Sequence, residues 1–153
     1  MVFDLAGLLR SLRDAEVEFI VIGGIAVAAH SVVRATEDLD VVPKPDADNL
    51  SRLLDLLEQR DARLLLRPQR SVDARVRRAV LNGRNLTVTT ELGDLDVVQR
   101  LPGVPSYADL EADAMLVELH GVPFRVCSRE HLLTMKRARG SALDQADIER
   151  LTR

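Results

Sequence analysis

The sequence predicts an α/β or α+β fold in which helices flank a mixed β-sheet. Leucine-rich stretches carry apolar residues at helical spacing, and short runs of β-branched residues lie between them. Helix and strand patterns alternate early in the chain and become mixed later, which is the order expected of helices packed on a mixed sheet. No stretch of linker composition divides the chain, so we expect a single domain over residues 1–153.

The first part of the chain is predicted to hold two long helices, two strands and one short helix. In order, we expect a helix at 3–15, a strand at 17–22, a glycine turn at 23–24, a short helix at 25–31, a strand at 38–42 and a helix that ends near residue 59. Two prolines, Pro43 and Pro45, end the second strand. Either Asp46 or Asp48 can cap the helix that follows.

The second part of the chain has shorter and less regular patterns. In order, we expect a strand at 62–66, an arginine-rich helix or mobile loop at 67–84, strands at 85–90 and 94–98, a connection at 99–113, a hairpin at 115–119 and 124–127, and helices at 128–139 and 144–151. Ser128 is a good helix cap, and Gly140 is a good helix terminator.

Composition excludes several classes of protein. Of 153 residues, 46% are hydrophobic and only 3% are aromatic, so recognition of nucleic-acid bases by stacking is not expected. The net charge of −3 gives no overall basic field. Cys127 is the single cysteine, which excludes an internal disulfide and a cysteine zinc site. The apolar runs are strand-sized and no signal peptide is apparent, so we expect a cytoplasmic protein without membrane contact.

A glycine pair and two spaced aspartates form the most informative motif. Gly23 and Gly24 follow an apolar strand and precede a short helix, whose first N–H groups can bind an anion such as phosphate. Asp38 and Asp40 lie two residues apart in the next strand, so both carboxylates share one face. Two facing carboxylates favour a divalent cation such as Mg²⁺ between them. The motif therefore predicts a site for a metal-bound nucleoside triphosphate.

The pentapeptide Asp-Leu-Asp-Val-Val occurs twice, at 38–42 and at 94–98. We interpret the two copies as adjacent strands whose aspartates can converge. Asp96 is then the candidate for a third metal ligand, and it can also serve as the base that takes a proton from an acceptor hydroxyl. Asp94 lies on the same face and remains a rival for this role.

The run from Gly23-Gly24 to Asp38-x-Asp40 resembles the signature of the polymerase-β-like nucleotidyltransferase superfamily. The Ala-rich helix and the sequence Arg34-x-Thr36-x-Asp38-x-Asp40 are similar to the bacterial branch that includes AbiEii-type and MenT-type toxins. The resemblance implies the nucleotidyltransferase fold and Mg²⁺-dependent transfer of a nucleoside monophosphate from an NTP. It also implies a third carboxylate in an apolar-Asp-apolar step, which fits Asp96.

Three further residues are candidates for binding the triphosphate. The guanidinium of Arg34 can bind phosphate oxygens or pair with Glu37 or Asp38. Thr36 either belongs to the site or is a residue favoured in strands. By the resemblance, Lys136 and the segment from Asp144 to Ile148 are similar to a pattern of Lys, then Arg, then Lys-Asp-x-x-Asp-hydrophobic. Here Leu143 replaces the usual second lysine, and the arginine spacing differs from the pattern. Lys136 is the candidate triphosphate-binding cation; its alternative is a solvated helix face.

One local concentration of basic charge can bind RNA through phosphate contacts. It consists of seven arginines: Arg63, Arg67, Arg70, Arg75, Arg77, Arg78 and Arg84. The toxin resemblance implies RNA as the acceptor and an antitoxin protein as a further candidate partner. Two alternatives stay open: a binding or regulatory module whose catalysis has faded, and an antibiotic-type adenylyltransferase that modifies a small molecule.

Overall fold

The computed structural model describes residues 3–30 and 37–152, and their strands form one eight-stranded mixed sheet. The strand order across the sheet is β4-β3-β5-β6-β2-β1-β8-β7. The strands are β1 (Phe19–Ile22), β2 (Asp38–Pro43), β3 (Arg63–Leu64), β4 (Arg67–Ser71), β5 (Leu86–Thr90), β6 (Gly93–Val97), β7 (Met115–Leu119) and β8 (Val122–Val126). The predicted fold class is confirmed.

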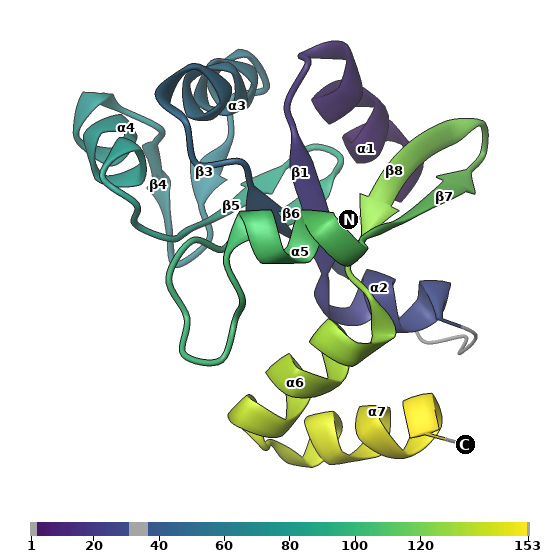
Figure 1. Cartoon of the computed structure of the whole chain (residues 1–153). Helices are drawn as coiled ribbons and strands as arrows, with labels where there is room; N and C mark the ends of the chain where they lie inside the picture. The colour runs from purple at the N-terminus through teal and green to yellow at the C-terminus, as the bar shows by residue number, and fades with distance from the viewer. Residues whose placement is uncertain (1–2, 31–36, 153) are drawn as a thin grey trace.

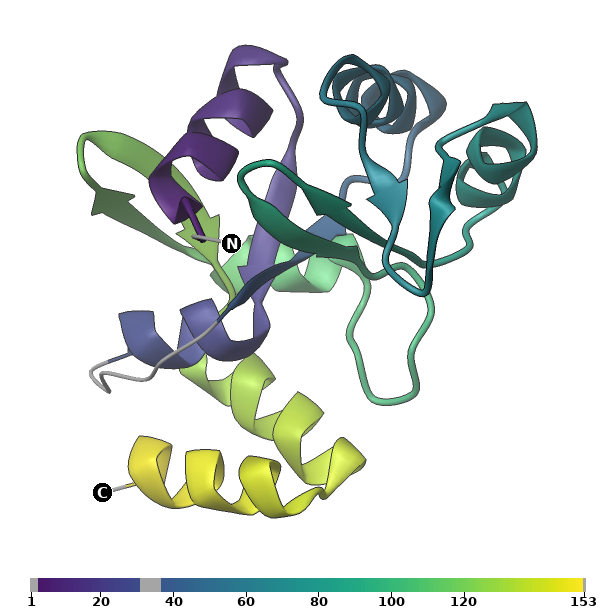
Figure 2. The same cartoon turned by 180° about the vertical axis from the view of Figure 1, so that it is seen from behind.

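Seven helices of the described residues surround this sheet (Figures 1 and 2). They are α1 (Leu5–Asp14), α2 (Gly23–Ala29), α3 (Ala47–Gln59), α4 (Ala74–Leu81), α5 (Tyr107–Asp113), α6 (Arg129–Arg139) and α7 (Ala142–Thr152). The two views show α5 on one face of the sheet and α1 on the other, while α2, α6 and α7 lie together beyond one end of the strands. None of these helices is both long enough and apolar enough to span a bilayer.

The central strands alternate buried apolar residues with aspartates. On β2, Leu39 and Val41 are buried, whereas Asp38 is exposed and Asp40 is half-buried. On β6, Leu95 and Val97 are buried and the two aspartates are half-buried. This period of two is the one predicted for the pentapeptide, and it separates an apolar face of the sheet from a carboxylate face.

Two segments differ from their sequence predictions of a helix or loop at 67–84 and a connection at 99–113. The arginine-rich stretch forms β4 and then α4, which begins where the Asp73 side chain accepts a hydrogen bond from the Val76 N–H. The expected connection at 99–113 contains α5, capped by the Ser106 side chain through the Asp109 N–H. A serine cap three residues before an acidic residue is a helix-start signal, so α5 could have been found from the sequence.

Several helix boundaries follow from their caps. Asp46, rather than Asp48, caps α3 by accepting a hydrogen bond from the Asn49 N–H. Ser128 caps α6 as predicted, and Gly140 ends it in the left-handed conformation. The last helix begins at Ala142, two residues before its expected start, because the Asp144 side chain accepts hydrogen bonds from both Ser141 N–H and Ser141 O–H.

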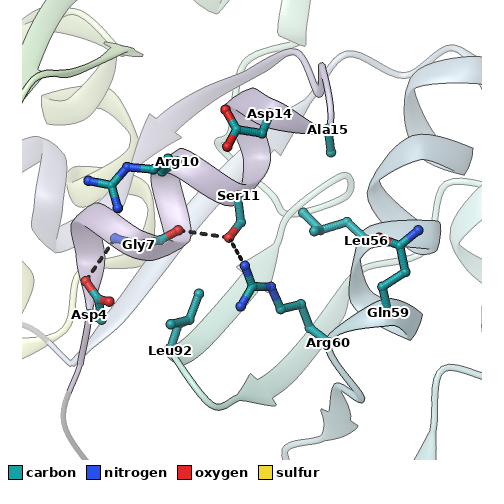
Figure 3. Close-up of a pocket in the computed structure, with 10 residues that line it drawn as sticks. All are labelled: Asp4, Gly7, Arg10, Ser11, Asp14, Ala15, Leu56, Gln59, Arg60 and Leu92. Atoms are coloured by element: carbon teal, nitrogen blue, oxygen red, sulfur yellow. Dashed lines mark hydrogen bonds between the residues drawn. The ribbon is translucent and has the colours of Figure 1, made fainter.

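A polar cavity of about 440 Å³ lies between α1, α3 and the turn that joins β5 to β6 (Figure 3). Arg60 donates to the Ser11 hydroxyl at 2.8 Å, and that hydroxyl donates to the Gly7 carbonyl at 2.9 Å. Arg60 also pairs with Glu91 at 2.7 Å. These contacts tie α1 to α3 and to the sheet, so we interpret this cavity as part of the scaffold.

Asn49 joins the start of α3 to the segments before β1 and after β2. Its side chain is fully buried; its Oδ1 accepts from the Glu18 N–H at 2.7 Å, and its Nδ2 donates to the carbonyls of Glu18 and Lys44, each at 2.9 Å. Three backbone groups therefore depend on one amide. No other neutral side chain has both the donors and the acceptor that this position requires, apart from the longer glutamine.

We expect Asn49→Ala to lower the free energy of unfolding by about 3 kcal/mol, because it leaves buried backbone groups without hydrogen-bond partners. Denaturant unfolding followed by circular dichroism measures the change. The matched control is Gln59→Ala at the exposed end of the same helix, for which we expect a change within about 0.5 kcal/mol. Equal unfolding midpoints for the two variants would contradict this account of Asn49.

Candidate functional site

The two copies of the pentapeptide lie side by side in the sheet. Strands β2 and β6 are parallel neighbours, and their register pairs Asp38 with Asp94 and Asp40 with Asp96. Paired residues of neighbouring strands point to the same face. The sequence prediction of adjacent, converging strands is confirmed, and the carboxylates of Asp40 and Asp96 lie on one face of the sheet.

A cavity of about 290 Å³ opens beside these carboxylates. Asp40 and Asp96 both line it, together with Gly23, whereas Asp94 is not among its lining residues. Asp38 lies two residues before Asp40 on β2; it is exposed and is not among the lining residues. Between the two rivals on β6, the structure therefore brings Asp96 into the same cleft as Asp40.

The environment of Asp40 disfavours its charged form. Burial, followed by the charges of Asp38 and Asp96, raises the pKa of Asp40 from 3.8 to about 7. A hydrogen bond between the side chains of Asp40 and Asp38 acts in the same direction, and the positive charge of Lys136 opposes it. Crowded carboxylates with raised pKa values are typical of sites that bind a cation or move a proton.

Asp96 is held in place by a neighbour that sequence reasoning missed. The Thr87 hydroxyl on β5 donates to Asp96 Oδ1 at 2.8 Å. Burial raises the pKa of Asp96, the Thr87 hydrogen bond lowers it, and the charge of Asp38 raises it further, with a net upward shift. Thr87 is the antiparallel partner of Asp96, so strand pairing alone could have identified it.

Gly23 is required by the close approach of Asp40. Its φ of +72° lies in the left-handed region, and a Cβ atom at this position would collide with Oδ2 of Asp40. Because Gly23 reverses the chain within one residue, α2 begins at Gly23 rather than at residue 25, and Gly24 lies in its first turn. Among the described residues, no side-chain hydrogen bond caps the start of this helix at Ile22. Arg34 and Thr36 lie outside the described residues.

Lys136 lies at the cleft but is already paired. Its side chain is 6% exposed, and its Nζ lies 3.2 Å from Asp147 Oδ2 and 3.4 Å from Asp144 Oδ1, both of which belong to fully buried side chains. The Lys…Asp-x-x-Asp pattern thus forms a buried ionic cluster between α6 and α7. The role of Lys136 as a triphosphate-binding cation stays a prediction.

Arg139 is a second cation at the cleft, and it was not chosen from the sequence. Its Nε and Nη2 each donate to the Asp144 carboxylate at 2.7 Å, while its side chain is 64% exposed. Hydrogen bonds from Arg139 and then from Ser141 hold the pKa of Asp144 well below its usual range. Asp144 therefore stays charged and orients Arg139 along the wall of the cleft.

The remaining walls of the cleft are apolar. They come from α6 and from the loop between β6 and α5, and consist of Val98, Leu101, Pro102, Val104, Leu132, Met135 and Ala138. Gly103 packs so closely on the Ala138 side chain that a Cβ would collide with it. This contact fixes the loop against α6 at the wall of the cleft.

No three His, Cys, Asp or Glu side chains within residues 3–30 and 37–152 come together as a group that could by itself hold a metal ion. The donor set nevertheless fits Mg²⁺, which commonly takes one or two carboxylates and completes its shell with water and phosphate oxygens. Asp38 and Asp40 are neighbours on β2, and a hydrogen bond between their side chains contributes to the raised pKa of Asp40. Their assignment as metal ligands, together with that of Asp96, stays a prediction.

Comparison with known families and curated proteins gave no match. Solved structures do match in fold. The lincosamide antibiotic adenylyltransferase LnuA, solved with lincomycin bound, aligns over 97% of this chain and 94% of its own with a TM-score of 0.69 and 17% identity. ANT(2'')-Ia, solved with adenylyl-2''-tobramycin, aligns over 96% and 84% with a TM-score of 0.60 and 12% identity.

A third similar structure is an antigenic nucleotidyltransferase-like protein from Paracoccidioides brasiliensis. It aligns over 96% of this chain and 72% of its own with a TM-score of 0.60 and 22% identity. At these identities the likeness establishes the fold and leaves activity and acceptor to be argued from the site. No match distinguishes the toxin branch that the sequence resembles. The chain therefore shares the fold of these nucleotidyltransferase structures.

Proposed function

We propose that this protein is a Mg²⁺-dependent nucleotidyltransferase that moves a nucleoside monophosphate from an NTP to an acceptor hydroxyl. The observation that carries the proposal is the register of β2 and β6, which places Asp40 and Asp96 in one cleft beside Gly23. Asp38 and Asp40 would bind the metal-bound triphosphate, and the uncapped N–H groups of the first turn of α2 would bind its phosphate oxygens.

In this proposal Asp96 is the general base, which its place in the cleft beside Asp40 supports. Its raised pKa brings the carboxylate closer to the range in which it can accept a proton at neutral pH. The acceptor hydroxyl would give its proton to Asp96 while its oxygen bonds to the α-phosphorus of the NTP. The bond from that phosphorus to the bridging oxygen then breaks, and pyrophosphate leaves with the bonding electrons. Bound Mg²⁺ would stabilise negative charge on these oxygens.

The acceptor we propose is RNA, as the toxin resemblance implies, and an antitoxin is then a candidate partner. A small-molecule acceptor is the second candidate. It is favoured by the apolar walls of the cleft, which suit an uncharged organic group, and by the fold shared with LnuA and ANT(2'')-Ia.

Incubation with each NTP, labelled at the α-phosphate, together with Mg²⁺ and total RNA tests the reaction and its acceptor. We expect label on RNA. Label on a small molecule in a parallel incubation with a metabolite extract would support the second candidate instead. Label in no fraction with any NTP would contradict the proposed activity and favour a nucleotide-binding module without catalysis.

We expect Asp40→Asn and Asp96→Asn each to lower the transfer rate at least about 100-fold, because each removes a charge that the reaction needs. Asp94→Asn is the matched control, since Asp94 lies on the same face of β6 but does not line the cleft. It should keep nearly full activity.

The metal-free stability of Asp40→Asn should equal or exceed that of the wild type, because repulsion between neighbouring carboxylates is relieved. A large loss of stability would make Asp40 a structural residue.

The raised pKa of Asp40 predicts how stability depends on pH. Between its ordinary value of 3.8 and its folded value of about 7, the folded protein binds more protons than the unfolded chain. The free energy of unfolding without metal should therefore fall as pH rises through this interval. Mg²⁺ should raise the Tm more at about pH 8 than at about pH 5, since it replaces the proton. Melting curves in EDTA and in Mg²⁺ measure both effects, and identical pH profiles for wild type and Asp40→Asn would refute the assignment.

A further inference from the structure

A third cavity, of about 450 Å³, lies along α4 and the turn that follows it. It is an open groove lined by Arg75, Arg78, Ala79, Asn82, Arg84 and Arg100. We call its four arginines, Arg75, Arg78, Arg84 and Arg100, the basic groove. No aspartate or glutamate is among the lining residues, although the chain as a whole has a net charge of −3.

The other arginines of this region behave differently. Arg77 lies 2.9 Å from Asp55 and 3.4 Å from Glu58, both on α3. Arg63 pairs with Asp61 at 2.8 Å, and Arg70 pairs with Asp73 at 3.5 Å. Within the described part of the chain, Arg75, Arg78 and Arg84 have no acidic group within salt-bridge distance. Three of the arginines without such a partner, Arg75, Arg78 and Arg84, are therefore gathered in the groove, whereas Arg67 on β4 lies outside it.

Two side-chain amides, those of Asn85 and Gln99, hold the backbone beside the groove in place. Asn85 accepts from the N–H groups of Gln99 and Arg100 and donates to the Arg100 carbonyl, at 2.7–2.8 Å. Gln99 donates to the carbonyls of Val80 and Arg84 at 2.9 and 2.8 Å. These bonds hold the turn after α4 against the segment after β6. The Arg100 guanidinium, which donates to the Asn82 carbonyl at 2.9 Å, is held in place by the same frame.

We propose that the basic groove binds the phosphate backbone of a nucleic acid. Four guanidinium groups on a fixed frame, without acidic partners, match a row of phosphates in charge and in hydrogen-bonding geometry. The partner is a nucleic acid rather than an acidic protein, because the groove offers no aromatic or large apolar anchor of the kind that protein interfaces use. For the same reason the contact is to the backbone and does not read the bases by stacking.

The groove adjoins the catalytic cleft through one loop, which runs from β6 to α5 (Figure 1). Arg100 faces the groove, while the next two residues, Leu101 and Pro102, form part of the cleft wall. A nucleic-acid strand bound in the groove is therefore separated from the carboxylate cleft by the loop between β6 and α5. Its end would be the acceptor hydroxyl, a consequence that rests on the proposed function.

The salt dependence of binding tests the groove without requiring catalysis. Fluorescently labelled single-stranded RNA and DNA of the same sequence are titrated with the protein at several salt concentrations, without NTP or Mg²⁺. Replacing Arg75, Arg78 and Arg84 together by Gln should weaken binding. It should also flatten the slope of log affinity against log salt by about 2, because each lost phosphate contact removes about 0.7 from the slope.

The control variant replaces Arg13, Arg63 and Arg70 by Gln, which removes the same charge from arginines that have acidic partners. It should keep the wild-type slope. A third variant, in which Lys replaces Arg75, Arg78 and Arg84, should restore most of the slope of log affinity against log salt, since lysine still neutralises phosphate. Thermal melts confirm that all variants fold.

Binding of RNA, of DNA or of both with this pattern supports the groove, and the two titrations distinguish the source of the phosphates. Equal slopes for the two Gln variants, or no binding by the wild type, would overturn it. A wild-type protein that binds with the expected slope but transfers no label retains the groove and loses the proposed activity. If the protein transfers label but the Gln variant of Arg75, Arg78 and Arg84 keeps the wild-type slope, the proposed activity is retained and the groove is rejected.

Discussion

The parallel pairing of β2 with β6 is the constraint on which the candidate site depends. Leu39 and Leu95 are paired in register and fully buried, and each is flanked by aspartates that point the other way. A slip of one residue on either strand would expose leucines and bury carboxylates. The apolar face therefore holds Asp40 beside Asp96 against their mutual repulsion, and the raised pKa of Asp40 is the electrostatic consequence.

The cations around the cleft do not cancel this repulsion. Lys136 and Arg139 are matched by Asp144 and Asp147, which are both fully buried, so the α6–α7 cluster is close to neutral. Removing one member of such a cluster leaves an uncompensated buried charge, which is strongly destabilising. The cluster therefore holds α6 and α7 together beside the cleft. The influence of Lys136 on Asp40 is consequently small beside that of burial and the neighbouring carboxylates. The excess negative charge stays in the cleft, where a cation would be bound.

The sequence was sufficient to predict the features that follow from the two-residue period of a β-strand. Alternation in the repeated pentapeptide predicted the shared face of Asp38 and Asp40, and the repeat itself predicted that its strands are neighbours. Features that depend on packing between distant segments were beyond it. Nothing local in the sequence indicates that Lys136 is enclosed by Asp144 and Asp147. The helix α5 was not predicted for a different reason. Gly103 and Pro105 are typical of turns, and the serine cap that starts the helix directly follows them.

The arginine-rich segment shows how tertiary partners change the meaning of a charge run. Neighbouring residues on a helix point about 100° apart, so Arg77 and Arg78 face different surroundings, while Arg75 and Arg78 share a side. Asp55 and Glu58, three residues apart on α3, form the acidic face against which α4 packs. Counting charge along the sequence treats these arginines alike. Only the packing of α3 on α4 separates the arginine that stabilises the fold from those whose charge is left for a partner.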